Sequence, residues 1–165
     1  MDFRTALKNQ THAALKMLAE CIEGCPLELW LSGKHPRLYW KVAYHATMYA
    51  DCFLSPSFDA WERWPLHRRE AGWTMSDDGT EIPIIEPYAP DQVLSYLSQV
   101  QGRVDERIDA LDLVADDCGF PWYADMARAE LLLLNLRHIS EHTGQLHELR
   151  IAAGLDVEWQ GSRDY

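Results

Sequence analysis

The chain contains 165 residues, of which 47% are apolar and 25% are charged, and its formal net charge is −11. These proportions are typical of a globular protein and exclude disordered and collagen-like chains. The length favours a single domain, spanning 1–165, that buries a real core. Because an acidic chain repels phosphate groups, we expect neither nucleic acid nor an anionic membrane among its partners.

The cysteines and the start of the chain carry no sign of an exported protein. Four cysteines without zinc-ribbon spacing are too few for a disulfide scaffold, so we expect reduced, buried thiols. They are Cys21, Cys25, Cys52 and Cys118. The first residues open a polar amphipathic segment rather than a signal sequence, and the longest apolar run, 129–136, is too short to span a bilayer. The expected location is therefore the cytoplasm.

Apolar residues recur at helical spacing in four segments. The predicted helices span 2–23, 36–53, 91–111 and 123–153. Gly24 and Pro26 end the first of them. Pro36 suits the first turn of the second helix, where a missing N–H costs nothing.

The segment 54–89 breaks every helical pattern with its prolines and glycines. So long a connection in a small domain is usually functional, or it carries the chain across the fold. A short helical turn is predicted near Phe58–Trp64. Three tryptophans, Trp61, Trp64 and Trp73, are expected to pack this crossover against the helices, with a pocket wall or lid as the alternative.

No segment alternates for long enough to predict a sheet. The predicted fold is all-α. It is a four-helix bundle with a long crossover between the second and third helices, which need not be antiparallel neighbours.

Two histidines, His138 and His142, lie one turn apart in the fourth predicted helix. They are separated by roughly 40° around the helix, so both imidazoles can reach the same point. Neutral imidazole is the commonest protein ligand for zinc, nickel and similar ions. His45 lies on the apolar stripe of the second helix, where an imidazole needs a partner. The three histidines together predict a metal site, because bundle cores build such sites from facing helices.

A metal-free interpretation stays open at this point. An i, i+4 histidine pair alone is weak evidence, since exposed polar residues or hydrogen-bonded core histidines give the same pattern. His147 points elsewhere around the helix, and His12 on the first helix is a minor competitor for the site. His35 and His67 lie in connecting segments and are interpreted as surface residues.

The run His142-Thr143-Gly144-Gln145-Leu146, preceded by His138 and combined with His45, resembles the DinB-like (damage-inducible) family of four-helix-bundle proteins. The resemblance extends over essentially the whole chain in helix order, crossover and length. It implies an up-down-down-up bundle, a divalent ion such as zinc or nickel held by the three histidines, and a homodimer. Relatives include thiol-dependent S-transferases and a mycothiol-dependent maleylpyruvate isomerase, while many members have no assigned reaction.

Three neutral imidazoles leave at least one coordination position open, as in catalytic metal sites. A bound water can lose a proton there near neutral pH, or a substrate thiol can bind as thiolate. Gln145 is the candidate catalytic residue, orienting a ligand or substrate, although a surface amide fits equally well. Tyr49 can line the pocket but is expected to pack in the core. Glu141 is interpreted as a solvated carboxylate rather than a fourth ligand.

The sequence therefore favours a metal-dependent enzyme. Thiol transfer between a small thiol and an electrophilic substrate is the leading reaction, with hydrolysis by a metal-bound water behind it. The alternative is a non-catalytic metal-binding or scaffold bundle that acts through dimerisation, and a metal-free bundle comes third. No Gly-rich phosphate loop, nucleophile elbow or paired-carboxylate motif offers another chemistry.

Overall fold

The structure is a computed structural model that describes residues 2–74 and 81–164. It is mostly helical, as predicted, and the described part adds two very short strands. The elements in chain order are α1 (Phe3–Ile22), α2 (Leu27–Trp30), β1 (Gly33–Lys34), β2 (Arg37–Leu38), α3 (Tyr39–Phe53), the 3-10 turn η1 (Arg69–Gly72), α4 (Pro90–Ala110), the 3-10 turn η2 (Pro121–Tyr123) and α5 (Arg128–Ala152).

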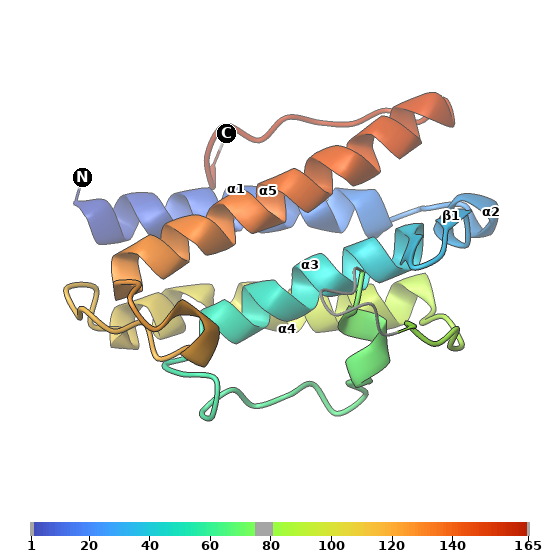
Figure 1. Cartoon of the computed structure of the whole chain (residues 1–165). Helices are drawn as coiled ribbons and strands as arrows, with labels where there is room; N and C mark the ends of the chain where they lie inside the picture. Colours follow the sequence, from blue (N-terminus) through green and yellow to red (C-terminus); the bar gives the residue numbers. More distant parts are fainter. Residues whose placement is uncertain (1, 75–80, 165) are drawn as a thin grey trace.

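Four long helices lie side by side and bury one apolar core between them (Figure 1). Helices α1 and α3 each pack against both α4 and α5. The core side chains follow the helical period expected from the sequence; fully buried examples are Leu15, Leu18, Leu97, Val104 and Ile139. Burial of such a stripe, rather than intrinsic helix propensity, supplies most of the stability of helices of this length.

The second predicted helix begins later than expected. Pro36 is not in its first turn but in the turn of the β1–β2 hairpin, after a cis peptide bond to His35. The helix starts at Tyr39, whose N–H donates to the carbonyl of Ser32 at 2.9 Å. A two-residue strand is shorter than any alternating pattern that could be detected, so this hairpin could not be predicted from periodicity.

The fourth predicted helix also begins later, at Arg128 rather than at 123. The residues before it form the 3-10 turn η2, and the Arg128 N–H donates to the carbonyl of Ala115 instead of to a helical partner. Its guanidinium caps the carbonyls of Ser55 and Pro56 at the start of the crossover. Tertiary hydrogen bonds therefore decide where this helix starts.

No helix forms at Phe58–Trp64, where a single turn is closed by the Trp61 N–H and the Phe58 carbonyl at 3.4 Å. In the described part of the crossover, the one 3-10 helix is η1. The expected packing is confirmed for Trp61 and Trp64, which are buried, whereas Trp73 is only half-buried. The Trp61 indole N–H also donates to the carboxylate of Asp51 in α3 at 2.8 Å. Hydrogen bonds and aromatic burial thus hold the crossover against the helices.

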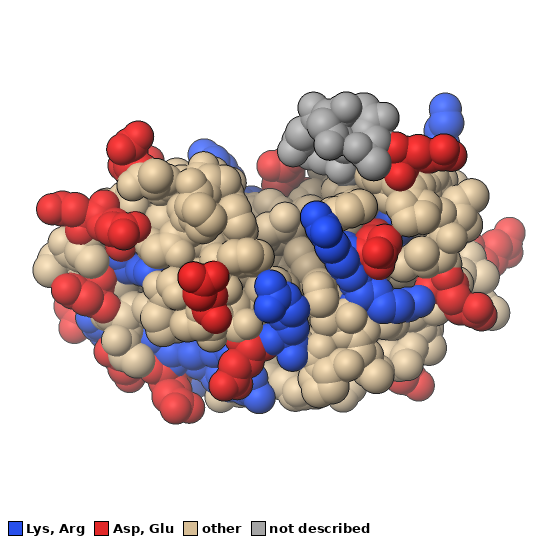
Figure 2. All heavy atoms as spheres, turned by 60° about the horizontal axis from the view of Figure 1, so that its bottom comes forward, with Lys and Arg blue, Asp and Glu red and all other residues tan. Residues whose placement is uncertain are grey.

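The described cysteines are all free, and three of them are buried, as expected for reduced thiols. Within the described ranges, no helix combines the length and the apolar character needed to cross a bilayer. Figure 2 shows one face of the molecule on which acidic side chains are scattered and basic ones are interspersed among them. That face carries mixed charge rather than a uniformly basic stripe of the kind that binds nucleic acid.

We predict that Asp51→Ala destabilises the protein by about 3–5 kcal/mol. The buried Asp51 carboxylate accepts hydrogen bonds from Trp61 and from the Tyr96 hydroxyl at 2.8 Å, and it pairs with Arg107 at 2.5 Å. Its removal leaves the Trp61 and Tyr96 donors without their acceptor, and it leaves the Arg107 guanidinium with the backbone carbonyl of Asp51 but no anion. Urea unfolding of the variant and the unmodified chain measures the change.

The matched control is Asp109→Ala, which removes a carboxylate that pairs with Lys8 at 2.6 Å but is 56% exposed. Exposed pairs contribute about 0–1 kcal/mol, so this variant is expected to unfold close to the unmodified protein. Equal destabilisation by the two substitutions would contradict a structural role for the Asp51 network.

Candidate metal centre

Three histidines from two helices come together as the sequence predicted. His45 projects from α3, and His138 and His142 project from α5. The Nε2 atom of His138 lies 3.0 Å from Nε2 of His45 and 3.1 Å from Nε2 of His142. All three ring nitrogens lie within 4.8 Å of one another, so a single ion can contact them all.

A backbone carbonyl fixes the orientation of the His45 ring. Nδ1 of His45 lies 2.6 Å from the carbonyl oxygen of Gly72 in η1. A carbonyl only accepts hydrogen bonds, so Nδ1 carries the proton and Nε2 keeps its lone pair. That lone pair is available on the side where His138 and His142 lie.

A two-step hydrogen-bond chain fixes the His142 ring in the same way. The Arg37 guanidinium donates to Oε1 of Gln145 at 2.9 Å, and the same oxygen lies 3.0 Å from Nδ1 of His142. Because arginine has only donors, the atom facing it must be the amide oxygen. Nδ1 of His142 therefore donates, and its Nε2 lone pair is left for a ligand.

The geometry of the cluster fits a metal ion. Tetrahedral zinc with Zn–N bonds of about 2.0–2.1 Å places its ligand nitrogens about 3.3 Å apart, close to the two separations around His138. The Nδ1 atom of His138 is buried and has no hydrogen-bond partner in the described part of the chain. The competing arrangement is a hydrogen-bonded cluster in which His138 shares one proton with a neighbour. A proton on Nε2 of His138 can be donated to only one of the lone pairs of His45 and His142, whereas a metal ion can bind all three nitrogens.

Burial keeps all three imidazoles neutral, which is the form that binds metals. Desolvation lowers the pKa of His45 to about 4 and the pKa of His138 to about 3. Desolvation also lowers the pKa of His142, against an opposing effect of its hydrogen bond to Gln145. Arg37 and Lys41 add their positive charge to the surroundings of His45, which lowers its pKa further. Protons therefore compete weakly for these nitrogens near neutral pH.

Two aromatic rings form part of the wall around the cluster. The Tyr49 ring packs 4.7 Å from the His45 ring and 5.3 Å from the His138 ring, measured between centroids. Phe53, one turn further along α3, lies 6.4 Å from His138. Tyr49 therefore lines the site as well as packing in the core. His45 and His138 stay partly exposed, so the cluster remains accessible from solvent.

No fourth histidine, cysteine or carboxylate joins the cluster within residues 2–74 and 81–164. Glu141 is exposed, in agreement with its interpretation as a solvated side chain. Gln145 contacts His142 directly, so it lies where a residue that orients a metal ligand would lie. In the described part of the chain, the set consists of three neutral ligands without a further histidine, cysteine or carboxylate, which is the composition of open metal sites.

The remaining histidines lie away from the metal centre, and two of them are not the surface residues that the sequence predicted. His12 pairs with Asp105 at 2.9 Å and does not compete for the site. His35 and His67 are not free surface residues. His35 binds the carbonyl of Ile82 at 2.7 Å, and His67 lies 2.7 Å from the Tyr44 hydroxyl. Both contacts attach the crossover to the rest of the fold. His35 binds a carbonyl of the crossover, and His67 of the crossover binds the hydroxyl of Tyr44 in α3. Buried polar groups of this kind need hydrogen-bond partners.

Sequence reasoning missed three residues around the centre. Gly72 and Arg37 orient two of the ligands. They belong to a short 3-10 turn and a two-residue strand, which are too short for a periodic pattern to indicate which way a residue faces. Lys41 lies one helical turn before His45 and is buried in the structure, with 1% of its surface exposed. The spacing of Lys41 from His45 was visible in the sequence and was the only available signal.

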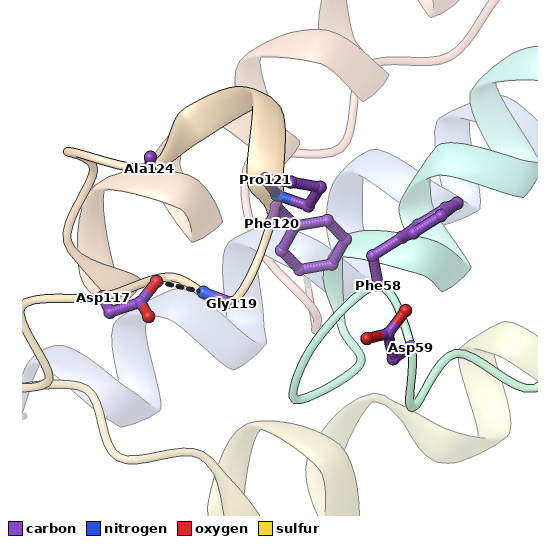
Figure 3. A pocket seen from close by; sticks show the side chains of 7 residues that line it. All are labelled: Phe58, Asp59, Asp117, Gly119, Phe120, Pro121 and Ala124. Carbon is purple, nitrogen blue, oxygen red and sulfur yellow. Dashed lines mark hydrogen bonds between the residues drawn. The ribbon is translucent and has the colours of Figure 1, made fainter.

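A separate hollow of about 330 Å³ lies near the end of α3, between the crossover and the 117–124 loop (Figure 3). Phe58 and Asp59 line one side, and the Asp117 carboxylate accepts from the Gly119 N–H at 2.7 Å on the other. Gly119 has a φ of +76°, and its carbonyl accepts from the Phe58 N–H. None of the three clustered histidines lines this hollow, and the carboxylate of Asp117 already has a structural partner.

Comparisons with known proteins leave the centre to be interpreted from its own geometry. No family model, no curated protein and no solved structure matches the chain.

We predict that the metal-free protein loses thermal stability as the pH falls from 6.5 to 5. The three histidines have lowered pKa values in the folded state. Below pH 6.5 the unfolded chain therefore takes up protons that the folded chain does not, which favours unfolding. Each such histidine costs up to about 1.4 kcal/mol per pH unit, and each kcal/mol lowers the Tm by about 2–4 °C.

Calorimetry of metal-free protein across this range measures the slope. His138→Asn removes the histidine with the lowest pKa and should flatten it. The same slope in both proteins would show that the cluster is not neutral in the folded state.

Proposed function

We propose that the protein is a metal-dependent enzyme whose centre is formed by His45, His138 and His142. One observation carries the proposal. His45 and His142 each use Nδ1 as a hydrogen-bond donor, so their Nε2 lone pairs face the ring of His138. The Nε2–Nε2 distances of 3.0 and 3.1 Å are close to the distance between two nitrogens bound to one metal ion. Imidazoles in a purely structural cluster have no need of this arrangement. The proposed ion is divalent, with zinc or nickel suited to three imidazole ligands.

We further propose that the chain is a cytoplasmic DinB-like protein with an up-down-down-up bundle. Its support is the spacing of the three histidines and the course of the helices. In Figure 1, α1 and α5 run in one direction and α3 and α4 run in the other. The crossover between α3 and α4 allows this, because it returns the chain to the end at which α3 began.

The proposed reaction is transfer of a small thiol to an electrophilic substrate. A bound divalent ion supplies a lower pKa for a thiol held at its open positions. The thiol releases its proton to solvent, and its sulfur forms a bond to an electrophilic carbon of the second substrate. The bond from that carbon to its leaving group breaks, and the leaving group departs to solvent with the electron pair. Gln145, held by Arg37, keeps the His142 ring in place and presents an amide beside the reacting groups. Tyr49 shields one side from water.

The competing proposal is a non-catalytic metal-binding or scaffold bundle that acts through dimerisation. Large apolar side chains exposed on α5 favour it, namely Leu133, Leu149 and Ile151. Surface of this kind often marks contact with another protein. The two proposals share the metal centre and differ in whether thiol and electrophile are converted.

We predict that His142→Ala removes both the metal and any thiol-transfer activity while the protein stays folded. Two imidazoles are too few to hold the ion tightly, and His142 stands on a regular helix that does not need its side chain. Elemental analysis of protein purified without a His-tag gives the metal content, and circular dichroism gives the helicity.

Gln145→Ala is the matched control on the same helix. It should keep the metal with an affinity about 10–100-fold lower, and keep part of the activity, because Gln145 acts through His142. Metal-free His142→Ala protein that turned over substrate at the original rate would end the proposed mechanism and favour the scaffold.

The protein is also proposed to be a homodimer. The tryptophan content alone gives this little support, since four of the seven tryptophans are buried inside one chain, Trp30, Trp40, Trp61 and Trp64. Exposed Trp159 and the apolar residues of α5 are the available contact groups. Light scattering at micromolar concentration should give twice the monomer mass of 19.0 kDa. The monomer mass would refute the dimer.

A further inference from the structure

A buried lysine without a partner lies beside the metal centre. Lys41 in α3 is 1% exposed, and its Nζ has no hydrogen-bond partner within the described residues. The nearest acidic influence is Glu70 in η1, but no ion pair within 4.0 Å joins the two. A buried ammonium group without an anion is unfavourable. Burial lowers the pKa of Lys41, an effect that the charge of Glu70 opposes. An anion bound to Nζ would stabilise the charged form, which the described side chains do not pair.

Lys41 is positioned on the side of α3 that faces the centre. It precedes His45 by one helical turn, so the two side chains lie on the same face of the helix. The same face is covered by η1, whose Gly72 carbonyl accepts from His45 and whose Glu70 carboxylate lies near Lys41. The ammonium group and the ligand nitrogens therefore lie under one short segment of the crossover.

A second cation, Arg37, also borders the centre. Arg37 donates through Nη2 to Gln145, which contacts His142. Its remaining guanidinium N–H groups are left for a further acceptor. Both cations are close enough to His45 for their charges to lower its pKa. Two cationic donors beside the same ligand match the two oxygens of a carboxylate.

We propose that Lys41 and Arg37 bind a carboxylate group of the substrate held at the three-histidine centre, so that the substrate is a small organic anion. This inference rests on the proposed metal function and names the substrate class for it. Lys41 provides most of the recognition, because its ammonium group is desolvated and no group in the described ranges competes for it. Arg37 contributes less, because it is exposed and already engaged with Gln145.

The test uses the full chain loaded with Co²⁺, whose visible spectrum reports its ligands. Four thiols are titrated, and the sulfur-to-cobalt absorption gives each dissociation constant. Mercaptoacetate and 3-mercaptopropionate carry a carboxylate at two distances from the sulfur, 2-mercaptoethanol is neutral, and cysteamine is cationic. At least one of the two carboxylates is expected to bind tenfold or more tightly than 2-mercaptoethanol, and cysteamine is expected to bind most weakly.

Lys41→Met replaces the ammonium group with an apolar side chain of similar length. The variant is expected to lose the preference for carboxylates while its affinity for 2-mercaptoethanol stays within about twofold. It also supplies the reference for intrinsic differences between the thiols. Lys8→Met is the control for net charge, since Lys8 pairs with Asp109 between α1 and α4, which carry none of the ligands. It should keep the full preference.

The outcomes separate this inference from the function on which it rests. A protein that takes up no Co²⁺ at the centre overturns the metal proposal and the substrate class together. A cobalt protein that binds charged and neutral thiols equally overturns the substrate class alone, and this comparison needs no variant to fold. A preference that survives in Lys41→Met, or disappears in Lys8→Met, likewise overturns the role given to Lys41.

Discussion

The centre depends on which of its two nitrogens each imidazole uses as a hydrogen-bond donor. His45 donates through Nδ1 to the Gly72 carbonyl, and His142 donates through Nδ1 to Gln145. Each bond fixes both the tautomer and the rotation of its ring, so the opposite nitrogen is presented as an acceptor at a defined place. Without these two bonds the three imidazole rings could adopt several orientations, and only some of these would bring the Nε2 atoms together.

The packing of the helices fixes the distances between the backbone positions of the three histidines. Helix α3 packs against α5, which brings His45 opposite His138 and His142. The apolar core around this contact, with Ile139 and Leu146 on α5 fully buried, keeps the two helices in one register. Packed interiors resist such displacements because side chains there leave few voids. The site therefore takes its precision from the core and its ring orientations from segments outside it.

The sequence predicted what periodicity controls and missed what tertiary contacts control. The convergence of the three histidines was accessible, because i, i+4 spacing and an apolar stripe fix the direction of side chains on a helix. Of the residues that orient the rings, Gln145 was accessible from its spacing on the same helix, whereas Gly72 and Arg37 were not. Gly72 contributes through a backbone carbonyl, which every residue has, and Arg37 lies in a hairpin of two-residue strands. Neither residue type nor spacing marks such contacts.

The boundaries of the helices show the same division. Residue patterns located α1 and α4 to within one residue, because capping groups and the apolar stripe end together there. At the starts of α3 and α5 the pattern continues past the true boundary. Backbone N–H groups of Tyr39 and Arg128 bind Ser32 and Ala115 instead of helical partners. A hydrogen bond made by a distant segment outweighs local propensity when both conformations are allowed locally.

Local and overall charge differ in this protein, and the difference bears on what its centre can attract. The chain carries a formal net charge of −11, which disfavours anions at long range. At the centre the three ligands are neutral, so a bound divalent ion would keep its full charge, and Arg37 and Lys41 would add to it. Screening at physiological salt limits the repulsion by exposed carboxylates to about 8 Å, whereas a desolvated ammonium acts on a neighbouring group with little screening. For a small anion, the local field of the proposed centre therefore outweighs the charge of the surface.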